Sequence, residues 1–114
     1  PSAYKIYVLM ALGNLHNLKS EYQKSGEYYE QTLELLKKGI DRIHQTRYLV
    51  IIAQDYYRAG ETQKALDLSN ESLTLSRSRE QQTIAAAALF EIARIERDLG
   101  NFNNVRTRNE EAIQ

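Results

Sequence analysis

Few side chains in this chain have the types and spacing that catalysis or metal binding requires. Its only histidines, His16 and His44, do not stand in a His-Glu-x-x-His pattern, and no carboxylate is placed to complete another ligand set. The chain contains no cysteine, so it can form neither a disulfide bond nor a thiolate metal site. It also lacks the Gly-x-Ser-x-Gly turn of a nucleophilic serine and a glycine-rich phosphate loop. We therefore expect no catalysis, no metal and no cofactor.

The composition narrows the classes of partner. Hydrophobic residues make up 42% and charged residues 26% of 114 residues, which is typical of one globular domain with a sizeable core. Fifteen basic and fifteen acidic residues cancel, so no overall field would attract nucleic acid or an anionic membrane. No apolar run approaches the roughly 20 residues that span a bilayer, and the first residues show no signal-peptide pattern. We expect a cytoplasmic protein that binds neither nucleic acid nor membranes.

The elements that organise the chain follow from a pattern that recurs every 40 residues. Corresponding positions are occupied by Leu9, Leu49 and Leu89, by Leu12, Ile52 and Ile92, and by Gly13, Ala53 and Ala93. A fixed period of this size indicates a helical solenoid, in which each unit is one supersecondary element that buries its apolar face against its neighbours. Apolar residues spaced three and four apart predict one pair of helices in each unit. The predicted helices cover residues 2–18, 21–38, 42–59, 61–77, 79–99 and 102–114.

The ends of these helices carry recognisable signals. Two stretches that begin at Ser20 and Ser78 read as capping boxes, in which the serine hydroxyl would bond the start of the next helix. Asp41 is expected to cap the third helix in the same way. Gly26, inside the second helix, is expected to allow a close approach between helices. The helices are expected to close at glycines, namely Gly39, Gly60 and Gly100.

The repeated positions resemble the tetratricopeptide repeat, whose first helix carries a large apolar residue, then Leu-Gly, then Tyr. Leu9, Leu12-Gly13 and His16 occupy these positions in the first copy, and the turn glycine of the family corresponds to Ser20, Gly60 and Gly100. The resemblance implies an all-α, right-handed α-α superhelix of three helix–turn–helix repeats in a single domain, 1–114. The repeats are expected at 4–39, 42–79 and 80–114, with the last one truncated. The period is longer than the family's usual 34 residues, and the closing proline is absent.

The resemblance also implies where a partner would bind, because the first helix of each pair lines the concave groove in this family. The expected groove residues are Tyr7, Met10, Asn14, Asn17, Arg47, Val50, Gln54, Tyr57, Arg58, Phe90, Glu91, Arg94 and Arg97. Asn14, Gln54 and Arg94 form one equivalent row that could hydrogen-bond a peptide backbone.

Four of these residues, Arg47, Arg58, Arg94 and Arg97, would make the groove locally basic. A basic groove favours an acidic or C-terminal-carboxylate segment as the ligand. The alternative is that these arginines are solvated and pair with Glu91, Glu96 or Asp98.

The function implied by the resemblance is non-catalytic binding of a partner peptide or helix. Two alternatives remain open. The third copy, over residues 92–102, also resembles repeats that precede a caspase-like CHAT domain, so the chain could be a regulatory or sensor segment of a larger bacterial signalling protein. It could instead be a structural spacer. The sequence begins without Met and ends inside the last predicted helix, so we expect a fragment of a longer protein. Exposed apolar surface on that last helix is expected to favour self-association.

Overall fold

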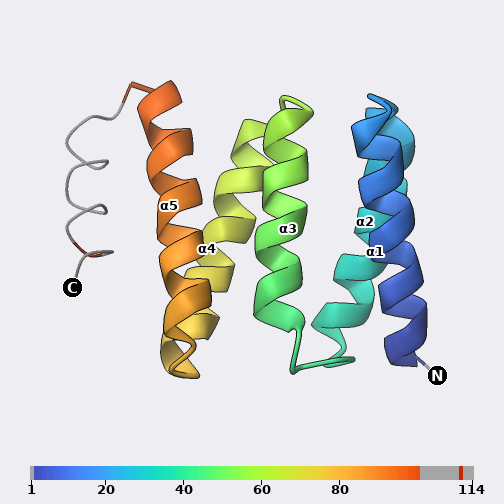
Figure 1. The fold of residues 1–114 in the computed structure, drawn as a ribbon, viewed down its shortest axis with the longest axis horizontal. Coiled ribbons are helices and arrows are strands. Elements are labelled where there is room, and N and C mark those ends of the chain that lie inside the picture. Colours follow the sequence, from blue (N-terminus) through green and yellow to red (C-terminus); the bar gives the residue numbers. More distant parts are fainter. Residues whose placement is uncertain (1, 101–110, 112–114) are drawn as a thin grey trace.

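The computed structural model describes residues 2–100 and residue 111, and this part of the chain is built from five α-helices without any strand. The helices are α1 (Ser2–Leu18), α2 (Tyr22–Lys37), α3 (Gln45–Arg58), α4 (Thr62–Ser78) and α5 (Gln82–Asp98) (Figure 1). The all-α prediction is thus confirmed, and so is the alternation of first and second helices. The sixth helix expected from Phe102, with the self-association expected from it, lies outside the described residues.

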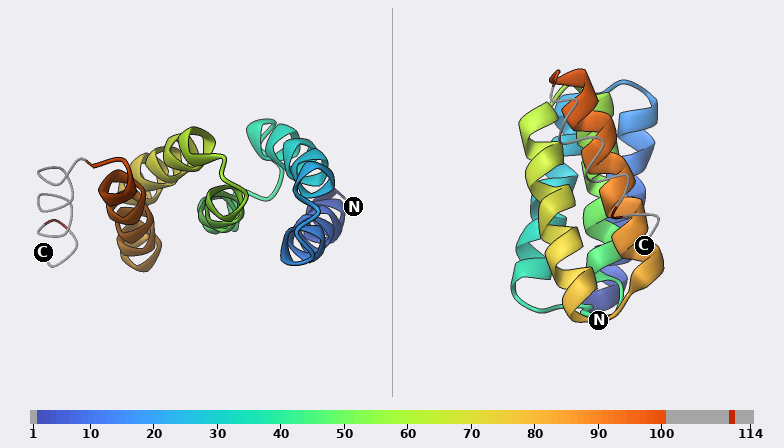
Figure 2. Two further views of the ribbon diagram at one scale, coloured as in Figure 1. Left: turned by 90° about the horizontal axis from the view of Figure 1, so that it is seen from above. Right: turned by 90° about the vertical axis from the view of Figure 1, so that its left-hand side faces the viewer.

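The helices form two layers. In Figure 1, α1, α3 and α5 stand side by side in front, and α2 and α4 lie behind them. Each helix of the front layer packs against a helix of the back layer, with α1 on α2, α3 on α4 and α5 on α4. Seen from above, the front layer is shallowly concave, because α3 is set back between α1 and α5 (Figure 2). The expected groove residues therefore all lie on helices of this front layer.

The turns inside the helix pairs close by one repeated mechanism. Ser20, Gly60 and Gly100 all have positive φ, at 62°, 85° and 83°. The Ser20 N–H donates to the Asn17 carbonyl at 3.0 Å, and the Glu21 N–H donates to the His16 carbonyl at 2.8 Å. These two bonds satisfy the last carbonyls of α1. The correspondence between Ser20 and the turn glycines is therefore confirmed.

The predicted capping boxes are wrong for the same reason. Ser20 has the left-handed conformation that closes α1, so it does not begin α2. The residue directly before α2 is Glu21, whose side chain makes no capping hydrogen bond. Ser78 is still part of α4, and its hydroxyl donates to the Leu75 carbonyl at 2.9 Å. The left-handed residue there is Glu80, with φ 57°, and α5 begins at Gln82 rather than Arg79.

The connection between the first two pairs is longer than predicted. The third helix begins at Gln45 rather than Arg42. Asp41 adopts a left-handed conformation with φ 55°, which is not the extended conformation of an N-cap residue. The Asp41 carboxylate accepts the His44 backbone N–H at 3.3 Å, so it organises this connection and does not cap the helix itself. The predicted closing residue Gly39 does adopt the left-handed conformation, with φ 85°.

The close approach of helices occurs at Gly13 and not at Gly26. A Cβ atom on Gly13 would lie 2.7 Å from Cδ1 of the buried Tyr29 ring, so the ring fills the space that a side chain would need. The Ser25 hydroxyl donates to the Gly13 carbonyl at 2.6 Å across the same crossing. A Cβ atom on Gly26 would meet only Tyr56, at an ordinary 3.9 Å. The expectation for Gly26 was therefore wrong, and it is Gly13 that allows α1 to pack closely against α2.

Candidate functional site

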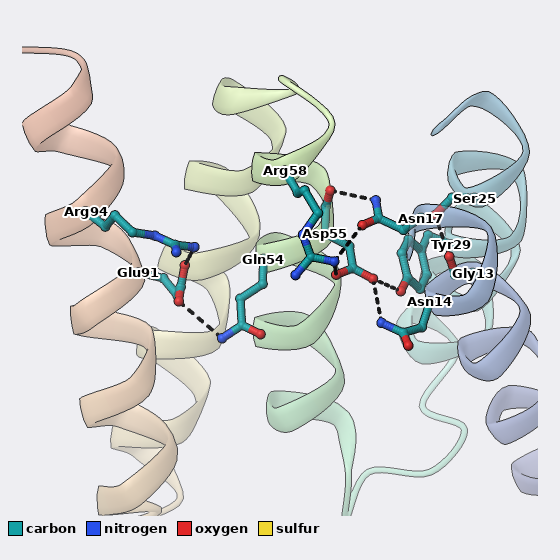
Figure 3. Close-up of polar contacts among 10 residues, drawn as sticks. All are labelled: Gly13, Asn14, Asn17, Ser25, Tyr29, Gln54, Asp55, Arg58, Glu91 and Arg94. Carbon is teal, nitrogen blue, oxygen red and sulfur yellow. Dashed lines mark hydrogen bonds and ion pairs between the residues drawn. The ribbon is translucent and has the colours of Figure 1, made fainter. Parts of the chain in front are cut away.

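A buried carboxylate joins the first helix pair to the second. Asp55, on α3, is only 3% exposed, and its Oδ2 atom accepts hydrogen bonds from the Tyr29 hydroxyl and from Asn14 Nδ2, the latter at 3.1 Å (Figure 3). Asn17 Nδ2 donates to the Asp55 backbone carbonyl at 2.9 Å. Arg58 Nη1 donates to Asn17 Oδ1 at 3.0 Å and lies 3.6 Å from Asp55 Oδ1. The charge is thus paired and hydrogen-bonded, as a buried charge must be.

This cluster gives three predicted groove residues a structural role. Asn14, Asn17 and Arg58 all bond within the junction between α1 and α3. The sequence interpretation missed Asp55, which is the acceptor at its centre. A signal was present: residues 15 and 95, at the corresponding positions of the other copies, are Leu15 and Ile95, so a carboxylate stands in an otherwise apolar row.

A second polar cluster lies between α3 and α5 and surrounds a hollow. Gln54 Nε2 donates to Glu91 Oε1 at 3.1 Å, and Arg94 Nη2 donates to Glu91 Oε2 at 2.5 Å (Figure 3). The Arg94 guanidinium lies over the Tyr57 ring, 4.5 Å from its centroid. The hollow has a volume of about 370 Å³ and is lined by Gln54, Tyr57, Arg58, Glu91 and Arg94.

Arg94 is the most distinctive residue of this hollow. Its side chain is 33% exposed, yet its Nε atom is buried and has no hydrogen-bond partner within the described part of the chain. Stacking on Tyr57 and the ion pair with Glu91 fix the guanidinium plane. A planar, fixed guanidinium is suited to binding a carboxylate with two parallel hydrogen bonds.

The remaining predicted groove residues divide into covered and exposed ones. Met10, Val50 and Glu91 are buried at 7%, 5% and 3% exposure, so in this state their side chains serve packing between helices. Tyr7 and Phe90 are exposed, at 64% and 63%. Arg47 and Arg97 are exposed as well, and Tyr57 and Gln54 are partly exposed.

The local charge of this layer is lower than the arginine count suggests. Arg94 pairs with Glu91, as the alternative interpretation expected, and Arg58 lies close to the Asp55 carboxylate. Both arginines that line the hollow are therefore paired with a carboxylate, Arg94 with Glu91 and Arg58 with Asp55. What the hollow offers an anion is N–H donors rather than an unpaired charge.

Burial and neighbouring carboxylates change the acidity of two tyrosines at the junction of the pairs. Burial, reinforced by the bond to Asp55, raises the pKa of Tyr29 far above the usual value for tyrosine. Burial also raises the pKa of Tyr56, whose hydroxyl donates to Glu30 Oε1 at 2.7 Å. Both hydroxyls therefore stay protonated in the folded chain through the range in which exposed tyrosines ionise. They act as hydrogen-bond donors between helices.

Over residues 2–100 and 111, no three histidine, aspartate or glutamate side chains come together in a way that could hold a metal ion. In the same part of the chain, no helix is both long and apolar enough to cross a membrane.

Comparison with known proteins identifies the family. The sequence model of the tetratricopeptide repeat matches residues 4–78, which span α1 to α4. Searches of curated proteins and of solved structures gave no match. The family model covers well over half of the 114 residues. The chain belongs to the tetratricopeptide repeat family.

Proposed function

We propose that the chain is a non-catalytic interaction module whose α1–α3–α5 layer binds a segment of a partner protein and anchors a carboxylate of that segment between α3 and α5. Tetratricopeptide repeats generally mediate protein–protein interaction, which gives the class of ligand. The observation that carries the finer proposal is the hollow lined by Gln54, Tyr57, Arg58, Glu91 and Arg94.

The chemistry of the hollow favours a carboxylate over a cation or an apolar group. Its lining offers donors from Gln54, the Tyr57 hydroxyl and two arginines, and the only carboxylate, Glu91, is already bonded to two of these residues. The Arg58 side chain is 49% exposed, so it can still donate hydrogen bonds to a ligand carboxylate. Charge-assisted hydrogen bonds of this kind contribute about 1.5–3 kcal/mol each.

The rigidity of the layer supports the proposal. Gln54 and Arg94 each donate a hydrogen bond to one of the two carboxylate oxygens of Glu91, and the Arg94 guanidinium stacks on the Tyr57 ring. Because these side chains are ordered before the ligand arrives, little conformational entropy is lost when it binds. A peptide carboxylate, at a C-terminus or on Asp or Glu, is the group that this arrangement fits.

A peptide selection tests the proposal. Random peptides displayed with free C-termini would be selected on the wild-type chain, and the best binder would be synthesised with Asp and Glu intact, with those residues neutralised, and with an amidated C-terminus. Fluorescence anisotropy then measures each Kd. We expect loss of the anchoring carboxylate, or Arg94→Gln, to weaken binding about tenfold or more, since 1.4 kcal/mol corresponds to tenfold.

Arg97→Gln is the matched control, because Arg97 lies on the same helix, is exposed, and does not line the hollow. Its Kd should stay within about twofold of wild type. Equal losses of peptide affinity in the Arg94→Gln and Arg97→Gln variants would indicate diffuse electrostatic attraction and contradict an anchoring site. A selection that yields no specific binder would refute the proposal.

A further inference from the structure

A second hollow, here called the back hollow, lies between α2 and α4 and has a volume of about 450 Å³. Its lining comes from the first half of α2, from the C-terminal end of α3 and from the start of α4. The first two helix pairs therefore form it together, and it is complete within the described residues. It shares no lining residue with the hollow between the front-layer helices α3 and α5 (Figure 1).

Gly26 opens the back hollow. The corresponding position one repeat later is Leu66, whose side chain packs against both core clusters. Gly26 stands inside α2, where glycine is the least favourable residue after proline. Helix packing does not require a glycine there, because a Cβ atom would meet only Tyr56, at 3.9 Å. The missing side chain therefore leaves space that the packing of the helices does not use.

The carboxylates around this space suit a cation. Glu27, Glu30 and Glu61 line the back hollow together with one lysine, Lys64. Glu30 accepts the Tyr56 hydroxyl at 2.7 Å and lies 3.7 Å from the Lys64 ammonium. The side chains of Glu27 and Glu61 make no hydrogen bond and no ion pair within residues 2–100 and 111. Two carboxylates of the back hollow are thus free to pair with a ligand.

The position of Lys64 indicates which kind of cation the back hollow accepts. Its ammonium lies over the Tyr56 ring, 5.3 Å from the ring centroid, as well as beside Glu30. An aromatic face attracts ammonium and guanidinium groups through its negative quadrupole. The Lys64 side chain is 55% exposed, and an exposed ion pair of this kind holds a side chain only weakly. A cation from outside the chain can therefore take its place over the ring.

We propose that the back hollow binds a lysine or arginine side chain from a basic segment of a partner protein. The charged group would lie over Tyr56 and pair with Glu27 and Glu61, and the aliphatic part would pack on the half-exposed ring of Tyr22. Within the described residues the carboxylates are not grouped as metal ligands, so an extended organic cation is the ligand that fits. A protein is its source, because tetratricopeptide repeats generally bind proteins.

Nuclear magnetic resonance on the ¹⁵N-labelled chain tests the site with single side chains. The probes are N-acetyl-arginine amide, N-acetyl-lysine amide and, as the uncharged control, N-acetyl-citrulline amide. The two cations should shift the amides of Gly26, Glu27 and Ala59 with a common Kd on the order of 1–10 mM, because exposed ion pairs are weak. Equal shifts with the citrulline probe, or unchanged amides at about 50 mM of either cation, would overturn the proposal.

A blocked pentapeptide with one arginine between glycines tests whether a polypeptide can present the side chain. It should bind at least as tightly as N-acetyl-arginine amide. Binding about tenfold weaker or more would mean that the back hollow admits only a small free cation, and this would overturn the proposal.

Two substitutions should move the affinity for N-acetyl-arginine amide in opposite directions. Gly26→Leu introduces the residue found one repeat later, fills the back hollow and should weaken binding by about tenfold or more. Lys64→Gln removes the competing ammonium and should strengthen binding by about twofold to fivefold. Lys24→Gln is the matched control, because it removes the same charge from an exposed position outside the lining, and it should change the Kd by less than about 1.5-fold.

Circular dichroism melts identify any variant that fails to fold. Wild-type affinity in a folded Gly26→Leu variant, or weaker binding by Lys64→Gln, would overturn the proposal. Neither result depends on whether the hollow between α3 and α5 binds a carboxylate, since the two hollows have no residue in common.

Discussion

Replacement of Tyr29 by phenylalanine should measure how strongly the buried carboxylate joins the first two helix pairs. The ring remains and continues to fill the space beside Gly13, so the substitution removes only the hydroxyl that donates to Asp55. Asp55 would keep Asn14 at 3.1 Å and Arg58 at 3.6 Å. Because a hydrogen bond to a charged group contributes about 1.5–3 kcal/mol, we expect Tyr29→Phe to lower the free energy of unfolding by about 2 kcal/mol at pH 7.

The same substitution should change how stability depends on pH. Burial and the Asp55 carboxylate raise the pKa of Tyr29, so the folded chain keeps this proton after the unfolded chain has lost it. A raised pKa contributes stability that is fully present below the unfolded value, near 10, and is lost as pH rises above it. The wild type should therefore lose up to about 1.4 kcal/mol per pH unit more than the variant above pH 10. The stability gap between the two proteins should narrow accordingly.

Urea unfolding at pH 7, 9, 10, 10.5 and 11, followed by far-ultraviolet circular dichroism, measures both effects. Tyr4→Phe is the matched control, because it removes the same hydroxyl from a side chain that is 67% exposed. The reasoning is refuted if the Tyr29→Phe and wild-type curves run parallel above pH 10, or if the variant is as stable as wild type at pH 7. Tyr56, whose pKa is raised by burial and by Glu30, remains in both proteins and cancels in the comparison.

Three further substitutions test how the helices cross and close. Gly13→Ala should lower the free energy of unfolding in urea by a net of about 1–2 kcal/mol, because overpacking against the Tyr29 ring exceeds the gain in helix propensity. Gly26→Ala, at an uncrowded position, should raise it by up to about 1 kcal/mol, and equal responses at the two glycines would contradict the packing described. Ser20→Gly should raise the melting temperature, because the left-handed conformation costs a serine about 1 kcal/mol and costs glycine almost nothing. A lower melting temperature would mean that the serine side chain stabilises the turn.

The helices were predictable from sequence because their signals are local and repeated. Apolar spacing located all five described helices, and the 40-residue register assigned Ser20 to the turn position although it is not glycine. The capping boxes failed because the same Ser-x-x-Gln letters suit two structures. Two closing bonds to the carbonyls of α1 favour the structure in which Ser20 ends a helix. Only the backbone conformation distinguishes that outcome from a serine that begins one.

The candidate site was harder to predict because its bonds join residues about 40 positions apart. Register placed Asn14, Gln54 and Arg94 in one row, but it did not show that Asn14 bonds Asp55 or that Gln54 bonds Glu91. These partners depend on how adjacent pairs stack, which no local pattern encodes. Asp55 itself was passed over because carboxylates on helices are usually solvated. Its place in the row of Leu15 and Ile95 was the one available clue.

The central claim, that a partner carboxylate binds between α3 and α5, is tested most directly by nuclear magnetic resonance on the ¹⁵N-labelled chain titrated with the selected peptide. The Nε–H signal of Arg94, a group without a partner in the described structure, should shift with the same Kd as the amides of Gln54 and Tyr57. The amidated or neutralised peptide should leave these signals in place. Shifts confined to α2 and α4, with the Arg94 signal unchanged at saturation, would contradict the claim.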